Sequence, residues 1–142
     1  MRITNIKSTD GHQQPDCRAE NQSESDYVLQ TPYQFTIEID NTDVVFEVPE
    51  RFETDLNSVP PMFRWFVERD GVQRPAGLVH DYIARSDFLI RSIKGRYYKL
   101  DRKINDQLYE DILDIVGIKS YQRRAMYLAV RGYSIFRNLF KI

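Results

Sequence analysis

A histidine and an aspartate stand side by side in "GLVHDYIARSD" (Gly77 to Asp87), a run that is otherwise mostly apolar. A helix turns about 100° per residue, which places His80 just past the edge of the apolar arc formed by its neighbours. A half-buried imidazole can act as a general base, because burial and neighbouring groups tune how readily it takes a proton. The alternative is a histidine that caps a helix face or bonds a loop carbonyl.

A second helix, predicted to follow Asp101, carries the acid best placed to meet His80. Asp106 falls about 20° beyond the edge of that helix's apolar arc, so it faces the seam between helices. Glu110, Asp111 and Asp114 are predicted to be surface charges. An aspartate that bonds a histidine fixes the ring's tautomer and stabilises the imidazolium. We therefore predict His80 and Asp106 as a catalytic pair, with a helix-edge aspartate bonded to Tyr, Arg or a loop amide as the alternative.

A proline-bounded loop over residues 50–60 supplies further oxygen atoms. Its polar residues are Thr54, Asp55, Asn57 and Ser58. Together with Asp81, the side chains of Asp55 and Asn57 could bind a hard cation such as calcium. The alternative is a loop made rigid by its own Asx and Ser/Thr turns. Two histidines and one cysteine exclude a His/Cys zinc site within one chain.

Length and composition indicate one globular domain. The chain has 142 residues, of which 42% are hydrophobic and 29% charged, values typical of a soluble protein with its own core. The single cysteine, Cys17, allows no internal disulfide and favours a reducing compartment. The N-terminus has no apolar segment typical of a signal peptide, and no run is long enough to span a membrane.

The predicted fold class is α+β, with a polar arm, a hairpin and about four packed helices. Residues 1–26 are polar and predict an arm outside the domain 27–142, so we expect a chain without them to fold. Alternation of apolar and polar residues predicts a hairpin over 33–49, closed by a three-residue turn at Asn41 to Asp43. The helices are expected within 61–140, beginning with a short aromatic helix from Pro61 to Arg69.

Helix boundaries follow from local residue types. Pro75 suits the first turn of a helix that runs to about Ser86, and "SIKGRYY" is predicted to be a loop. Asp101 is a candidate N-cap, and Gly117 a candidate C-cap glycine. Ser120 begins the last helix. The expected core face of that helix is a stripe of small and apolar residues: Tyr121, Ala125, Leu128, Ala129, Gly132, Phe136 and Leu139.

Charge is distributed unevenly along the chain. Residues 119–142 contain six basic residues and no acidic ones, so all 21 acidic residues precede them. A basic, aromatic segment on an acidic body points to a partner surface. Acidic protein and the membrane surface stay open as partners, whereas nucleic acid is disfavoured because no nucleic-acid-binding motif is present.

The string "VPERFETDLNSVPPMFRWF … AGLVHDYIA … DRKINDQLYEDILDIVG" resembles an uncharacterised domain family common in tailed-bacteriophage and prophage genomes. The resemblance rests on the Thr-Asp-x-x-Ser-x-Pro loop and on the His-Asp-Tyr motif that ends at Tyr82, and it runs from about Val48 to Arg131. Arg51 replaces a usual glycine, and Ala84 replaces a usual second tyrosine. The resemblance to this family implies that the partners are other phage structural proteins in an oligomeric assembly. It also implies a location in the virion or the host cytoplasm.

The order of motifs is also similar to that of small phospholipases of the A2 type. That resemblance implies that His80 activates water, that Asp106 holds His80, and that Asp81 binds calcium beside the loop at Asp55 to Ser58. The disulfides and the glycine-rich calcium loop of those enzymes are absent here.

Two functions of different class follow from these observations. The first is a virion-associated structural or accessory protein of the tail or head–tail region, which acts through protein contacts and carries a clustered His–Asp site. The second is a His–Asp hydrolase, an esterase that acts on lipid or host envelope with calcium. The sequence leaves open whether the chain is an enzyme, although the first function is favoured.

Overall fold

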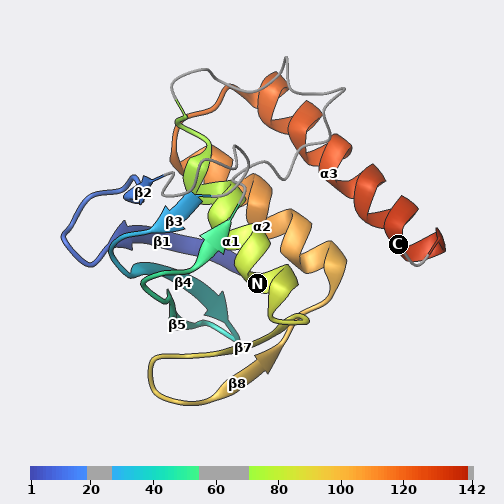
Figure 1. Cartoon of the computed structure of the whole chain (residues 1–142). Coiled ribbons are helices and arrows are strands. Elements are labelled where there is room, and N and C mark those ends of the chain that lie inside the picture. The colour runs from blue at the N-terminus through green and yellow to red at the C-terminus, as the bar shows by residue number, and fades with distance from the viewer. Residues whose placement is uncertain (19–26, 55–70, 141–142) are drawn as a thin grey trace.

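A computed structural model describes residues 1–18, 27–54 and 71–140 of the chain (Figure 1). The described residues form three helices and eight strands, which are arranged in three small antiparallel sheets. The α+β class is confirmed, but the expected arrangement of an arm, one hairpin and about four packed helices is wrong. The short helix expected from Pro61 to Arg69 lies outside the described residues.

The predicted hairpin supplies two of the three strands of one sheet. Strands β4 (Tyr33–Ile39) and β5 (Thr42–Val48) pair in antiparallel register, and Phe35 and Phe46 stack with their ring centres 5.3 Å apart. The turn has two residues rather than the expected three, because Ile39 pairs directly with Thr42. Asp40 and Asn41 both have positive φ, as a type I′ turn requires.

The N-terminal segment is part of this sheet and not an arm. Strand β1 (Arg2–Ser8) pairs with β4, which gives the sheet order β1-β4-β5. Ile3 and Ile6 are both buried, although residues three apart on a regular strand face opposite sides. A register shift between Ile3 and Asn5 turns both side chains inward. The sequence did not predict this strand, because only two of its residues are large and apolar.

Two smaller sheets flank the first. Strands β2 (Cys17–Arg18), β3 (Tyr27–Leu29) and β6 (Glu53–Thr54) form one of them in the order β2-β3-β6. Strands β7 (Leu89–Arg91) and β8 (Tyr97–Lys99) form a second hairpin, part of which was predicted to be a loop.

The helices begin and end where the local residue types predict. Helix α1 (Arg74–Arg85) carries a proline in its first turn, and helix α2 (Arg102–Ile115) is capped by Asp101, whose carboxylate accepts from the Ile104 N–H at 2.7 Å. Gly117 has a positive φ after α2, and the Ile118 N–H reaches back to the Leu113 carbonyl, as in a Schellman motif. Helix α3 (Ser120–Phe140) follows at once.

Helix α2 is the central helix. It packs against α1 on one side, against α3 on another, and against β1 of the sheet. Asp111, predicted to be a surface charge, is half-buried there and accepts from the Ile3 N–H at 3.1 Å. Within the described part of the chain, no helix is both long enough and apolar enough to cross a membrane.

Helix α3 buries a different face from the one predicted. Met126, Ala129 and Val130 are buried, whereas Tyr121 and Leu128 are exposed. Among the stripe residues whose burial the structure describes, Ala129 alone is buried. Figure 1 shows that the C-terminal half of α3 extends away from the sheets.

Candidate functional site

His80 lies at the edge of the buried face of α1, where the helical period places it. Its side chain retains 14% of its exposure, while Val79 and Ile83 on the same helix are almost completely buried. The ring of Tyr109 from α2 contacts the imidazole edge-on, with the ring centres 5.4 Å apart. Burial raises the pKa of the Tyr109 hydroxyl, so Tyr109 lines the site as an uncharged side chain.

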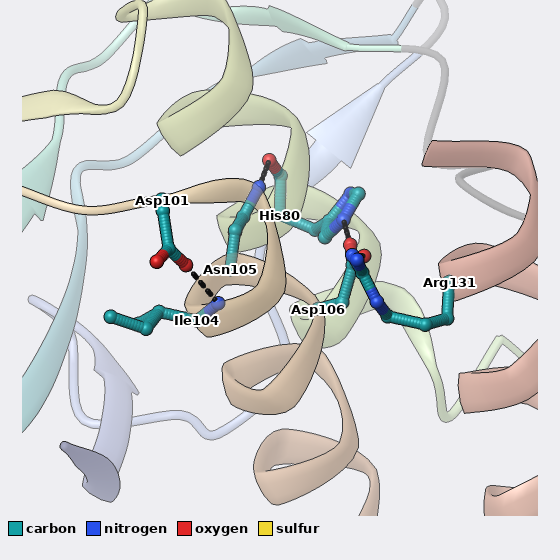
Figure 2. A network of polar contacts seen from close by, with 6 residues as sticks. All are labelled: His80, Asp101, Ile104, Asn105, Asp106 and Arg131. Carbon is teal, nitrogen blue, oxygen red and sulfur yellow. Dashed lines mark hydrogen bonds and ion pairs between the residues drawn. The ribbon is translucent and has the colours of Figure 1, made fainter. Parts of the chain in front are cut away.

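Asp106 meets His80 across the seam between α1 and α2, as predicted. Its side chain is 1% exposed, and its Oδ1 lies 2.7 Å from the His80 Nε2 (Figure 2). The second oxygen, Oδ2, accepts from Nη1 of Arg131 on α3, also at 2.7 Å. A buried carboxylate is stable only when paired and hydrogen-bonded, and both of its oxygens are bonded here.

The hydrogen bond to Asp106 determines which ring nitrogen of His80 is available. A carboxylate only accepts, so Nε2 carries the proton, and in the neutral ring Nδ1 keeps its lone pair. Among the residues that the structure describes, none hydrogen-bonds to Nδ1. The imidazole is thus held on one side and has a basic nitrogen on the other.

Asn105 fixes the backbone beneath this pair. Its side-chain Nδ2 donates to the His80 carbonyl at 3.1 Å, and Figure 2 shows it beside Asp106 on the same turn of α2. Consecutive residues of α2 therefore hold His80 by its main chain and by its ring. This double attachment fixes the distance between the two helices at the site.

Asp81 bonds a different partner from its neighbour His80. Its Oδ1 accepts from the Arg85 Nε at 3.0 Å one turn along α1, and the Arg85 guanidinium lies over the ring of Phe52. The other oxygen, Oδ2, is buried and has no hydrogen-bond partner among the described residues. Asp81 is therefore on the side of α1 that faces Phe52, near the start of the proline-bounded loop over residues 50–60, called here the motif loop.

Of the four polar loop residues, the structure describes Thr54. Asp55, Asn57 and Ser58 lie outside the described residues, whereas Thr54 ends β6, is fully buried, and belongs to a strand that contacts α1. Thr54, the last described residue before position 55, thus lies in a strand beside the helix that carries His80. In the described ranges, no three His, Cys, Asp or Glu side chains gather as a metal site would require.

Tyr82 is a packing residue. Its ring meets Phe35 edge-on at 6.1 Å and Phe52 at 5.5 Å, between the hairpin and the start of the loop. Burial raises the pKa of its hydroxyl. The third residue of the His-Asp-Tyr motif therefore seats α1 on the sheet, and its ring does not join the His80–Asp106 contact.

Arg131 and Asn105 are the two site residues that sequence reasoning missed. Arg131 was grouped with the basic charges of the last helix, yet it is next to Val130 on the buried face of α3. That adjacency was a signal, because an arginine beside a core position needs an acidic partner. Asn105 directly precedes Asp106, and its position offered no comparable signal.

Comparison with known proteins places the chain in a family. No curated protein matches the chain, and no solved structure matches it. A family model matches residues 27–130, a range that includes His80 and Asp106 and ends one residue before Arg131. The chain belongs to the family described as "Protein of unknown function (DUF1353)".

Proposed function

We propose that the chain is a His–Asp hydrolase in which His80 is the general base and Asp106 positions it. The observation that carries the proposal is the 2.7 Å bond from the His80 Nε2 to a carboxylate that is 1% exposed. The same bond leaves Nδ1 with a lone pair on a side chain that solvent reaches. A base must be held on one side and accessible on the other, and this arrangement supports both.

The proposed reaction is hydrolysis of an ester. The Nδ1 of neutral His80 removes a proton from water as the water oxygen bonds to the carbonyl carbon. The resulting oxyanion reforms the double bond and expels the alkoxide, and the imidazolium returns the proton to that alkoxide. One ester and one water give one acid and one alcohol, and His80 returns to its neutral form.

Asp106 and Arg131 would act on the ring and not on the substrate. The carboxylate keeps the Nε2 proton in place and stabilises the imidazolium that forms during the reaction. Arg131 balances its buried charge and fixes its second oxygen. Both are therefore positioning residues.

Calcium and a lipid or envelope ester belong to the same proposal. Asp81 is the described member of the proposed ligand set, and its buried, unpartnered Oδ2 fits one further ligand. Asp55 and Asn57 would supply oxygen atoms from the loop. Bound calcium would polarise the carbonyl oxygen of the ester. We expect calcium to raise the melting temperature of the chain, and the Asp81→Asn variant to lose that rise.

A panel of nitrophenyl esters and phospholipid vesicles tests the hydrolase. His80→Gln keeps an N–H group that can reach Asp106 but has no basic nitrogen, so it should lose about 10²- to 10⁴-fold in rate. His12→Gln is the matched control, because His12 is exposed and remote from the site in sequence. Equal hydrolysis by His80→Gln and the unchanged chain, or hydrolysis by neither, would contradict the proposal.

The second candidate is a virion-associated structural or accessory protein. The His80–Asp106–Arg131 contacts join three helices with balanced charge, which also suits a rigid packing domain. The motif loop and the His-Asp-Tyr motif support a phage origin through their resemblance to tailed-phage sequences. Mass spectrometry of purified particles is the test: the chain should be present at a fixed copy number. Its absence from the particles would eliminate this candidate.

A further inference from the structure

Helix α3 carries an apolar face that no described residue covers. The residues that contact α2 are centred on Met126 and Val130, and both are almost completely buried. On the opposite side, at about 100° per residue, lies a second row of small and apolar residues. We call it the outer stripe: Tyr121, Ala125, Leu128, Gly132 and Ile135.

The outer stripe is exposed over four turns. Tyr121, Leu128 and Ile135 retain 69%, 57% and 46% of their exposure, respectively. A Cβ built on Gly132 would meet nothing within 4 Å. Figure 1 shows that this part of α3 extends away from the sheets. Three large apolar side chains in one row are more than the scattered exposed residues of an ordinary surface.

The spacing of the outer stripe is that of a helix–helix seam. Its residues are separated by four, three, four and three positions, the repeat that keeps one face toward a partner helix. Large residues alternate with small ones, and the order reads the same in both directions from Leu128. A pattern that is symmetric about its centre matches an antiparallel copy of itself, as an isologous two-fold interface requires.

The positive charge that the described part of α3 carries toward α2 is matched within the chain. Arg131 pairs with Asp106 at 2.7 Å, Arg123 with Asp114 at 3.1 Å, and Arg124 with Glu110 at 3.4 Å. The described arginines of α3 therefore have acidic partners on α2. Two such helices can approach each other without the repulsion that the basic sequence alone suggests.

We propose that the outer stripe is a homodimer interface, in which α3 of a second copy docks antiparallel with Leu128 at the two-fold axis. In this register Tyr121 lies opposite Ile135 of the other copy, and the small residues Ala125 and Gly132 lie opposite each other, where they let the two helices approach closely. The His80 site lies where α2 faces α1 and α3, so this interface goes beyond the proposed hydrolase and does not depend on it.

Sedimentation equilibrium of the full chain tests the dimer. We expect a mass of twice the 16.9 kDa subunit at protein concentrations of about 10–100 µM. Leu128→Glu places two carboxylates at the axis and should weaken the dimer at least about tenfold. Leu89→Glu is the matched control, since Leu89 is 46% exposed on β7, and it should change nothing. A monomer at the highest concentration overturns the proposal.

Cysteine cross-linking tests the geometry. Leu128→Cys should form a disulfide dimer on oxidation, because the two positions meet at the axis. The native Cys17 is a suitable internal control, since it is buried and burial raises its pKa to about 11, which keeps its thiol protonated. A mixture of Tyr121→Cys and Ile135→Cys chains should form the heterodimer, whereas either alone should not. Efficient linkage of Tyr121→Cys to itself would indicate a parallel pair and contradict the proposal.

The outer stripe could instead be covered by another part of the chain or by a membrane, and thiol labelling and vesicle binding distinguish these two cases from the dimer. If the chain itself covers the stripe, the Leu128→Cys thiol labels slowly at dilutions where the chain is a monomer. If a membrane covers it, the unchanged chain is a monomer and binds anionic phosphatidylglycerol vesicles, and Leu128→Glu loses that binding. Either result overturns the dimer.

Discussion

The helix pair α1–α2 and the N-terminal strand β1 lie against each other, yet one was predicted and the other was not. The contact between His80 and Asp106 follows from the spacing of apolar residues along two helices. The polar composition of residues 1–26 predicts an arm in place of strand β1, although Ile3 and Ile6 belong to the core. The two regions differ in the number of apolar residues that mark the buried face in the sequence.

A helix of 12 or 14 residues repeats its buried face over three turns or more, so several residues define the same direction. Strand β1 has seven residues, and the register shift after Ile3 breaks the alternation that would reveal it. Its burial depends on the presence of β4 and α2. One deletion and three substitutions sharpen this comparison, from the largest expected effect to the smallest.

Removal of β1 should have the largest effect. A chain without residues 1–8 loses an edge strand and two buried isoleucines, a cost comparable to the whole stability of a domain of this size. We expect it to be unfolded by circular dichroism. Ile6→Ala should cost about 2–5 kcal/mol and Thr4→Ala, which is exposed, about 0.5 kcal/mol or less. A truncated chain with an unchanged melting temperature would restore the interpretation as an arm.

Asp106→Ala should have the next largest effect, because it leaves Arg131 and His80 without their shared acid. The loss in the free energy of unfolding should be about 3 kcal/mol in urea titrations. Asp114→Ala on the same helix is the control. Its partner is Arg123 and its side chain is 70% exposed, so the loss should be about 0.5 kcal/mol. Similar losses for both variants would mean that the buried network adds no stability of its own.

Asp101→Ala tests the N-cap of α2, which the sequence predicted. The carboxylate caps α2 at the Ile104 N–H, and its removal should cost about 1 kcal/mol. Asp101→Ser keeps a side-chain oxygen and should recover most of that loss. If alanine and serine are equally stable at this position in urea titrations, the cap is not what begins the helix.

Asp111→Asn concerns the contact between the two regions and should have the smallest effect. Burial raises the pKa of Asp111, and the Ile3 N–H offsets this in part. An acid whose pKa is raised in the folded state adds stability when protonated and loses it as pH rises through that pKa. The asparagine variant cannot titrate, so the unchanged chain should weaken relative to it as pH rises above the ordinary aspartate pKa of 3.8, by about 0.5 kcal/mol or less. If the two stability curves are parallel as pH rises, burial does not raise the pKa of Asp111 in the folded chain.

Much of the fold followed from local patterns. The hairpin, the starts of α1 and α2, the cap at Asp101 and the glycine at Gly117 depend on residues within a few positions of each other. The direction of Asp106 toward the helix seam was equally local. The hairpin turn was wrong by one residue, since either two or three residues at Asp40 to Asp43 can close it.

The sequence by itself thus determined where α1, α2 and α3 begin, the cap residues of α2, and that His80 and Asp106 face a common seam. Only the tertiary structure decided that Ile3 and Ile6 enter the core, that Arg131 completes the buried network, and which of two apolar faces of α3 is buried. The physical reason is the range of the interactions. Helical periods and caps are set by neighbours in the chain, whereas a bulged strand, a buried ion pair and the choice between two similar faces depend on groups that only the folded chain brings together.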